Sequence, residues 1–344
     1  MPNIDATRLE ALAHRIFAAL GSPAADAALI ARLLVRANLR GHESHGVIRI
    51  TQYADSVRKG EADPRAEIRV LAETPVLARL DGRRGFGQVV AERGMRLAIA
   101  KATAMGLSAV TLANTTHVGR LADYGEMAAA EGLVGLLWVN AVHGLNVAPW
   151  GGASRRLGTN PHAVVIPGAG GAVMVLDFAT SVVAEGKLRV KRNRKQPAPL
   201  GWFIDAKGEP ATDPEIFYGD PPGAILPAAD HKGYGLALAV EILGGILSGS
   251  GAAGPGTGLF QNGTLMVCLD VERFLPRAEF DRQVQALIAW VKASPRVPGV
   301  PEVLIPGEPE ARLEAERRAQ GVPLDDETWR QIETVAAELD VAQP

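Results

Sequence analysis

The sequence predicts an α/β protein in which helices at both ends of the chain flank a mixed middle of strands and helices. Apolar residues recur at helical spacing near both ends, and short β-branched runs bounded by Gly, Pro, Asn and Asp recur between them. A hydrophobic fraction of 47% and a charged fraction of 22% are typical of soluble globular proteins. A chain of 344 residues is long enough for one large core or two smaller ones.

Three helices are predicted in the first part of the chain. Apolar residues at helical spacing cover Asp5–Leu20. The pair Ser22-Pro23 then offers an N-cap followed by a first-turn proline, which predicts a second helix over Ala24–Leu39. A third helix is predicted over Gln88–Met105, where Gly106 ends the pattern.

Strands and helices alternate in the middle of the chain. The predicted strands are 68–71, 76–80, 107–112, 134–139, 162–166, 173–178 and 265–271. The predicted helices between them are 121–131, 234–247 and 279–292.

The end of the chain is helical again. Pro309–Gln320 places glutamates early and arginines late, which matches the helix dipole, and a further helix follows over Glu327–Leu339. We therefore expect residues 1–75 and 309–344 to pack as one discontinuous helical domain. Residues 76–308 are expected to form an α/β domain that binds cofactor and substrate.

Charge and composition argue against several kinds of partner. A net charge of −2 without a basic run gives no footprint for nucleic acid and no attraction to a membrane surface. Neither a secretory signal nor an apolar stretch of spanning length is evident, so we expect a soluble cytoplasmic protein. The single cysteine, Cys268, lies in an apolar run and is interpreted as a small buried hydrophobe.

A glycine-rich stretch over 249–258 contains a false lead for dinucleotide binding. Gly249–Gly254 matches G-x-G-x-x-G, but that motif requires a strand before it and a helix after it. Here a helical pattern precedes it and Pro255 follows, so we interpret the stretch as a flexible loop. A dinucleotide would have to bind by other means, outside a Rossmann arrangement.

The segment Arg40–Arg49 is the first candidate site. His45 can exchange a proton near neutral pH, Ser44 lies beside it, and Arg49 can grip a carboxylate with two hydrogen bonds. These residue types suit a 2-oxo or 2-hydroxy acid. A helix-capping turn is the alternative, whereas a hydrolase lacks its G-x-S-x-G elbow and the pair His42 and His45 lacks a third metal ligand.

Further candidates follow predicted strands or open predicted helices. His117 lies between a strand and a helix start, where it can contact a phosphate or substrate, or simply cap the helix. The others are Gly158–His162, Asp177–Ser181, Glu185–Lys187 and Asp230–Tyr234. Each alone is typical of a turn or cap, and their number in one chain favours a functional role.

Several strings in their order along the chain are similar to one known family. They are Glu43–Gly46, Gly158–Pro161, Asp177–Ser181, Gly186-Lys187, the stretch 201–214, His231–Tyr234 and Ile305–Glu308. Together they resemble the malate/L-lactate dehydrogenase family, also called the type-2 malate and lactate dehydrogenases. Ala289–Pro295 and Glu316–Leu324 resemble most the hydroxycarboxylate dehydrogenase B branch.

The resemblance implies a largely antiparallel α/β fold without a Rossmann motif, and a homodimer with the active site near the subunit interface. Members interconvert 2-hydroxy acids such as malate, lactate, sulfolactate and ureidoglycolate with their 2-oxo acids, using NAD or NADP, and some reduce cyclic imines. The branch named above reduces 2-oxo acids such as oxoglutarate, oxaloacetate and phenylpyruvate with NADH. We therefore expect NAD as cofactor, with NADP as the alternative.

The family's functional residues map onto this chain position by position. The resemblance implies that His45 donates the proton with Ser44 as its neighbour, although some members place the acid at the position of His117. It implies substrate contacts by Arg49, Thr159 and Lys187. The cofactor would be lined by His117, Val118, Gly119, Arg120, Leu121, Asp177, Phe178, Ala179, Lys232, Gly233, Gly307 and Glu308, with no metal.

Two other functions remain open. One is a reductase of cyclic imines of the piperideine-2-carboxylate type, which Lys187 disfavours because one imine-reducing branch has a catalytic aspartate there. The other is a non-catalytic ligand-binding relative, which the joint presence of Ser44, His45, Arg49, Lys187 and Lys232 disfavours. His143-Gly144 replaces the small polar and proline residues of many relatives, which leaves the substrate undefined.

Overall fold

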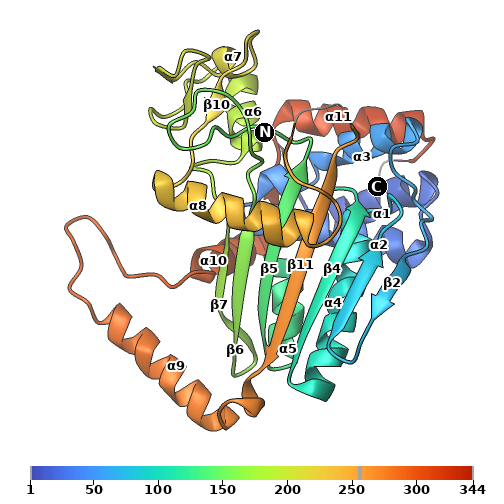
Figure 1. Cartoon of the computed structure of the whole chain (residues 1–344). Helices are drawn as coiled ribbons and strands as arrows, with labels where there is room; N and C mark the ends of the chain where they lie inside the picture. Colours follow the sequence, from blue (N-terminus) through green and yellow to red (C-terminus); the bar gives the residue numbers. More distant parts are fainter. Residues whose placement is uncertain (1, 255–257, 343–344) are drawn as a thin grey trace.

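A computed structural model describes residues 2–254 and 258–342 and is built around one large sheet (Figure 1). Its strands run in the order β2-β3-β4-β11-β5-β6-β7. The pair β3–β4 is parallel and the other five neighbouring pairs are antiparallel, so the predicted largely antiparallel sheet is confirmed. The strands are β2 (Arg69–Glu73), β3 (Leu77–Asp81), β4 (Leu107–Thr115), β5 (Leu133–Val142), β6 (His162–Gly168), β7 (Gly171–Phe178) and β11 (Gln261–Asp270).

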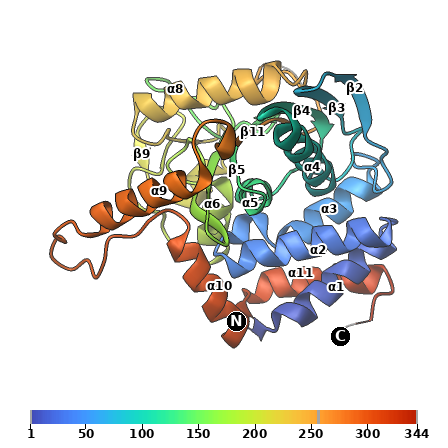
Figure 2. The same cartoon turned by 90° about the horizontal axis from the view of Figure 1, so that it is seen from below.

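Helices cover both faces of this sheet. Helices α4 (Gly87–Met105) and α5 (Ala122–Ala130) lie on one face, between the sheet and the terminal helices (Figure 2). Helix α8 (His231–Val240), continued by the π-helical turn η2 (Glu241–Ile246), lies on the other. The apolar core between α4, α5 and the sheet includes Met95, Leu112 and Leu137, all fully buried.

Both ends of the chain meet in one helical layer. It consists of α1 (Ala6–Ala19), α2 (Ala24–Leu39), α3 (Arg49–Arg58), α10 (Glu308–Gln320) and α11 (Asp326–Glu338). Strand β1 (Asn3–Ile4) pairs antiparallel with β12 (Val322–Pro323), and one apolar cluster joins Leu9 and Leu34 to Ile332. The division into domains 1–75 with 309–344 and 76–308 stays a prediction, which this cluster supports, although β2 leaves the first range to pair with β3.

Two of the longer helices, α3 and α6, were not predicted from the sequence. Helix α3 buries only Ile50, Tyr53 and Ala54, and α6 (Glu185–Asn193) buries only Gly186 and Leu188. Their apolar stripes are too narrow for periodicity to reveal them. A small unit follows α6 and comprises β8 (Phe203–Ile204), β9 (Pro210–Ala211), α7 (Pro214–Phe217) and β10 (Ala224–Ile225).

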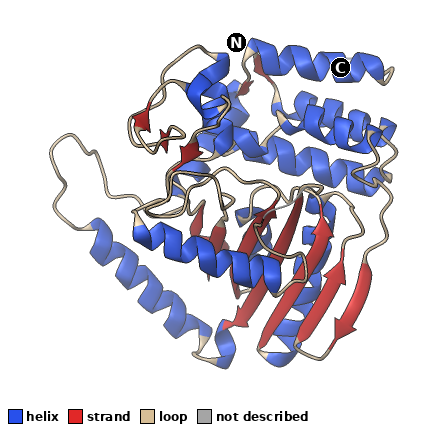
Figure 3. Cartoon of the chain, turned by 45° about the horizontal axis from the view of Figure 1, so that its top comes forward, coloured by secondary structure: helices blue, strands red, loops and turns tan. Residues whose placement is uncertain are grey.

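Helix α9 (Arg277–Lys292) stands away from the body of the protein (Figure 3). It has no buried residue, and Leu287 and Trp290 expose 62% and 80% of their surface. In the part of the chain that the structure describes, no helix is long and apolar enough to cross a membrane.

The glycine-rich stretch has the context that the sequence indicated. Helix α8 and η2 precede Gly249, and no strand stands between them and Gly254. The Gly251 carbonyl accepts a hydrogen bond from Asn140 Nδ2 at 3.0 Å, so part of this stretch packs on β5. Residues 255–257 of the predicted loop lie outside the described residues.

Candidate active site

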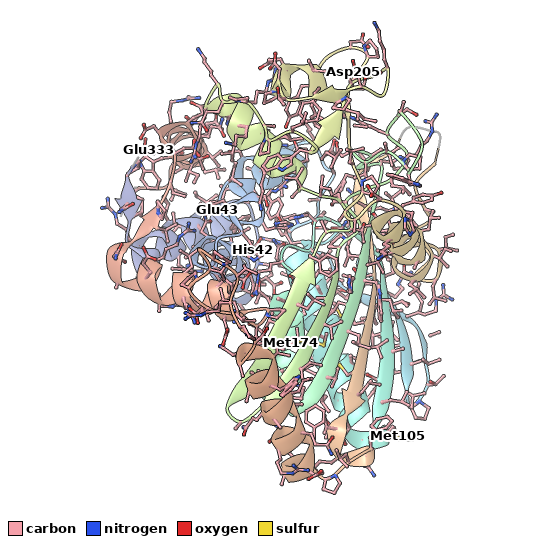
Figure 4. All side chains as sticks on the ribbon, turned by 90° about the vertical axis from the view of Figure 1, so that its left-hand side faces the viewer. His42, Glu43, Met105, Met174, Asp205 and Glu333 are labelled. Atoms are coloured by element: carbon pink, nitrogen blue, oxygen red, sulfur yellow. The ribbon has the colours of Figure 1, made fainter. Side chains whose placement is uncertain are left out.

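The candidate site begins with a tight turn, residues 42–49, which we call the His45 turn. It comprises the single 3₁₀ turn η1 (Glu43–His45), the residues that follow it and the first residue of α3. Asn38 Oδ1 accepts a hydrogen bond from the Val47 N–H at 2.7 Å. Gly46 packs so closely that a Cβ there would lie 2.0 Å from the same oxygen. The turn is therefore fixed from the end of α2, where the terminal helices meet the end of the sheet opposite Met105 (Figure 4).

The predicted trio Ser44, His45 and Arg49 is brought together within this turn. Ser44 Oγ lies 3.0 Å from His45 Nδ1. Arg49 folds back, so that its Nε donates to the Ser44 carbonyl at 2.7 Å and its Nη1 donates to Gln52 Oε1 at 2.6 Å. The guanidinium is thus held in one orientation close to the imidazole.

His117 approaches from the sheet and meets His45. It belongs to the residues that follow β4, which we call the His117 segment (114–120). The rings of His45 and His117 are stacked, with centroids 5.4 Å apart and planes inclined by 27°. On its other side His117 Nδ1 lies 2.6 Å from the hydroxyl of Tyr53, which in turn accepts from Gln88 Nε2 at 2.7 Å. His117 therefore does not cap α5.

The N-terminus of α5 is occupied by the protein's own carboxylate. Asp177 Oδ2 accepts a hydrogen bond from the Ala122 N–H at 2.8 Å. Arg120, whose side chain is 1% exposed, pairs with Asp123 at 2.8 Å. The sequence predicted an anionic group at this strand–helix junction, and in the structure the Asp177 carboxylate occupies the Ala122 N–H.

Burial governs the ionisation of the site. Burial, and then the charges of Arg49, His42 and Arg120, lower the pKa of His45 to about 3. Burial, Arg49 and His45 lower the pKa of His117 well below its usual value. Burial raises the pKa of Asp177 to about 6, although Arg120 and two backbone N–H groups oppose the shift. Both imidazoles are therefore neutral at neutral pH.

A cleft of about 530 Å³ opens beside the histidine pair. His117 and Tyr53 lie in its wall. Among the described residues, His45 and Arg49 do not line it, so the cleft reaches the pair from the His117 side. The wall carries the cations Lys59, Arg84, Arg189 and Arg192 and the carboxylates Asp55 and Glu61. Arg189 and Arg192 are already paired with Glu185 and Glu215, so the cleft is lined by charges of both signs.

The predicted substrate contacts other than Arg49 lie on different elements. Thr159 is half-buried, and its carbonyl accepts from the Thr180 N–H at 3.0 Å. The neighbouring Asn160 donates to the buried Glu241 at 2.9 Å, which fixes this loop against η2. Lys187 is exposed on α6, where its charge helps to lower the pKa of His42 to about 4, after burial and Arg120.

The predicted cofactor residues differ in how open they are. The side chains of Val118, Arg120 and Leu121 are buried, so these three can offer only backbone atoms to a ligand. Phe178 is 39% exposed and Lys232 is exposed at the start of α8. The remaining ones are Gly119, Ala179, Gly233, Gly307 and Glu308, whose carboxylate accepts from Lys292 Nζ at 2.5 Å.

Sequence reasoning missed Tyr53 and the role of Gln88. Tyr53 lies one helical turn after Arg49, so recognition of α3 would have placed it beside the site. Gln88 was predicted only as a helix start, and nothing local signals its contact with Tyr53. Within residues 2–254 and 258–342, no three His, Cys, Asp or Glu side chains are grouped so as to hold a metal ion.

The fold and the site define a class of protein: a dehydrogenase of 2-hydroxy acids that uses a nicotinamide cofactor on a sheet that is not a Rossmann sheet. The chain belongs to the malate/L-lactate dehydrogenase family, whose model matches residues 4–333. The resemblance predicted from the sequence is thereby confirmed.

Individual relatives agree with this assignment. Hydroxycarboxylate dehydrogenase B of Escherichia coli is 37% identical over 343 residues, which cover 98% of this chain and 95% of that protein. The structure of malate dehydrogenase from Pyrococcus horikoshii has a TM-score of 0.90 at 34% identity and covers 100% of this chain and 97% of that one. The Δ1-piperideine-2-carboxylate reductase from Pseudomonas syringae has a TM-score of 0.82 at 27% identity, with 98% and 100% covered.

Proposed function

We propose that this protein interconverts 2-oxo acids and 2-hydroxy acids by hydride transfer, with NAD(H) as its cofactor and His45 as the proton donor. The observation that carries the proposal is the fixed geometry of Ser44, His45 and Arg49, with a neutral imidazole beside a guanidinium. Membership of the malate/L-lactate dehydrogenase family gives the reaction class.

Arg49 is the residue that binds the substrate carboxylate. Its Nε and Nη1 are engaged by Ser44 and Gln52, which leaves the remaining N–H groups in a fixed direction. A guanidinium held in this way can donate two parallel hydrogen bonds to a carboxylate. Thr159 and Lys187 complete the proposed substrate contacts.

His45 moves the proton. In the oxidation of a 2-hydroxy acid, the neutral imidazole accepts the hydroxyl proton as the C–H hydride leaves. In the reduction of a 2-oxo acid, the imidazolium returns that proton to the oxygen. Ser44 Oγ, at 3.0 Å from Nδ1, orients the ring so that Nε2 is the reacting nitrogen.

The residues proposed for the cofactor fit a dinucleotide by their chemistry. A bound nicotinamide supplies or accepts the hydride. The exposed Lys232 can neutralise a phosphate, and the exposed ring of Phe178 offers an apolar surface. We propose NAD over NADP because the hydroxycarboxylate dehydrogenase B branch, which this chain resembles most, implies NADH.

We further propose that the protein acts as a cytoplasmic homodimer. The proposal is supported by apolar side chains that one protomer leaves exposed, including Trp290 on α9 and Ile242 and Ile246 on η2, the last two exposed by 55% and 57%. Sedimentation of the purified protein tests it: a dimer is expected, and Trp290→Asp should shift it toward the monomer. A monomer at all concentrations would contradict it.

The function is tested by absorbance at the reduced-nicotinamide band. The purified protein is assayed with a panel of 2-oxo acids and one cyclic imine, each with NADH and with NADPH. Turnover of a 2-oxo acid with NADH is expected. Faster turnover of the imine would favour the reductase alternative, and preference for NADPH would correct the cofactor. If no substrate of either kind is reduced with either cofactor, the proposed function is wrong.

A further inference from the structure

A buried hydrogen-bond chain, Gln88–Tyr53–His117, runs behind the histidine pair. Gln88 Nε2 is 2.7 Å from the Tyr53 hydroxyl, and that hydroxyl is 2.6 Å from His117 Nδ1. Gln88 and Tyr53 are 1% and 3% exposed, so water does not compete for these bonds. The three residues come from α4, α3 and the His117 segment, and they meet only in the folded protein.

The direction of the chain follows from the donors. The Gln88 nitrogen can only donate, so the Tyr53 oxygen accepts, and its own proton is left for His117 Nδ1. The Gln88 Oε1 is buried and accepts no hydrogen bond from the described residues. If the Gln88 amide were flipped, its NH₂ group would take the place of Oε1 and be buried with both N–H groups unpaired. Buried N–H groups without a partner are rarer in proteins than buried carbonyl oxygens without one.

We propose that Tyr53 and Gln88 are positioning residues that hold His117 in one neutral tautomer, with Nδ1 as acceptor and Nε2–H as a donor toward the cleft. This inference rests on the proposed function. His117 lines the cleft, and Nε2 is the ring nitrogen opposite the one that Tyr53 occupies. The neutral Nε2–H of His117 donates a hydrogen bond to the reacting oxygen of the substrate. The stacked His45 gives a proton to that same oxygen in reduction and takes it back in oxidation.

The surroundings of His117 favour the neutral ring. The stacked His45 and the guanidinium of Arg49 both oppose a positive charge there, in addition to burial, and lower the pKa of His117. A neutral ring has two tautomers, and only the one with Nε2–H can polarise a carbonyl oxygen. The hydrogen bond from Tyr53 therefore decides whether His117 presents a donor or a lone pair.

The tautomer is measured directly by NMR of protein with ¹⁵N-labelled histidine, in the absence of substrate and cofactor. The signals of His117 are identified as those missing from His117→Gln. In the wild type, Nδ1 is expected to have the chemical shift of an unprotonated ring nitrogen and Nε2 that of a protonated one. A protonated Nδ1 would overturn the proposal. The NMR measurement does not depend on enzymatic activity. It therefore tests the tautomer of His117 even if the protein does not reduce 2-oxo acids.

Kinetics of two variants test the consequence for the reaction. Tyr53→Phe keeps the ring packed between Phe17 and Phe86, whose centroids lie 6.1 and 5.8 Å away, and removes only the hydroxyl. Gln88→Leu removes the donor behind it. Each is expected to lower kcat for 2-oxo acid reduction by roughly tenfold, with NADH affinity changed by less than about twofold.

Because both residues act through one chain, the double variant should be no slower than the slower single variant by more than about twofold. The matched control is Ser108→Ala, which removes another fully buried hydroxyl bond, to the Ala98 carbonyl at 2.7 Å, at the far end of β4. It should lower the melting temperature and leave kcat unchanged. Unchanged kcat in both single variants, or losses that multiply in the double variant, would show that the chain is merely structural. If Tyr53→Phe does not fold, the proposal is tested by the kcat of Gln88→Leu and by the ¹⁵N chemical shifts of His117 in the wild type.

Discussion

The His45 turn and the His117 segment place two imidazoles in one stack, but they are supported in opposite ways. The hydrogen bonds that fix His45 come from nearby in the sequence, namely from Asn38, Ser44 and Arg49, although Arg317 of α10 also pairs with Glu43 of the same turn at 2.7 Å. Those that fix the His117 segment come from Tyr53, Gln88 and Asn262, the last of which accepts from the Val118 N–H across 144 positions of the chain. Local hydrogen bonds predominate in the His45 turn, whereas the hydrogen bonds of the His117 segment come from distant parts of the chain.

The two regions also differ in the groups that they hold. Arg49 puts a guanidinium beside His45, whereas His117 is held by a phenol and an amide. Under the proposed function, the charged steps, carboxylate binding and proton transfer, belong to the His45 turn. Neutral hydrogen bonding belongs to the His117 segment.

Replacement of His45 should have the largest effect on activity. His45→Gln keeps the size of the side chain but removes the titrating group, and a positioned acid typically contributes 10²–10⁴-fold. We expect kcat for 2-oxo acid reduction to fall by at least about a hundredfold. Stopped-flow or steady-state assays at saturating NADH measure it. If His117→Gln costs more than His45→Gln, the roles of the two regions are exchanged.

The pH dependence sharpens the same comparison. Because the pKa of His45 is lowered to about 3, the imidazolium fraction in the free enzyme falls about tenfold for each pH unit above that value. Thus kcat/KM for reduction should fall about tenfold per unit between roughly pH 5 and pH 8, and kcat/KM for oxidation should show no histidine limb near 6.5. His117→Gln should keep the slope and His45→Gln should flatten it. A plateau in reduction up to pH 6 would contradict the lowered pKa.

Arg49→Lys should have the next largest effect. Lysine cannot reproduce the planar fork, so kcat/KM should fall by the equivalent of roughly 1.5–3 kcal/mol while NADH affinity barely changes. Arg58→Lys, at the exposed end of the same helix and paired with Glu338, is the matched control and should leave kcat/KM unchanged. Equal losses in cofactor binding and in activity would move Arg49 into the cofactor site.

Asp177 tests the electrostatics next to the His117 segment. Its pKa in the folded protein is raised to about 6 from 3.8, so the folded state binds the proton more tightly than the unfolded chain. Its contribution is most favourable below pH 3.8 and is lost as the pH rises through 6. Asp177→Asn keeps a carbonyl oxygen that can accept from the Ala122 N–H but does not titrate. Between pH 4 and pH 7 its free energy of unfolding should therefore fall by roughly 1–2 kcal/mol less than that of the wild type. Urea unfolding measures it, and an unchanged profile would place the titration elsewhere.

The smallest effect is expected outside both regions. Gly251 belongs to the stretch that imitates a dinucleotide fingerprint, yet it follows helical turns and lacks the required strand. Gly251→Ala strains a backbone φ of +87° and costs some stability, but NADH affinity should change by less than about threefold, under ~0.7 kcal/mol. Isothermal titration measures it, and a hundredfold loss would return the stretch to the cofactor site.

The contrast between the two regions explains what the sequence could predict. Ser44, His45 and Arg49 were found because their chemistry lies within six consecutive residues. The terminal helices and most strands were found because their periodicity is strong. Tyr53 and Gln88 were missed because only the packing of α3 against α4 joins them, and Asp177 was not recognised as the cap of α5 because 55 positions separate it from Ala122. Local pattern carries no information on such partners.

The pairing of Asn3 with Pro323 joins the two ends of the chain, so this part of the fold cannot form until translation is nearly finished. A ribosome that adds roughly 5–20 residues per second needs on the order of 15–60 s between these two positions. During that interval α1 and α2 have emerged, but α11, which covers their apolar faces through Ile332 and Val335, does not yet exist. The nascent chain therefore exposes the apolar faces of α1 and α2 for most of its synthesis. These helices are translated first, yet their apolar faces are covered only after α11 has been made. Chaperone capture of the nascent chain should accordingly concentrate on its oldest residues.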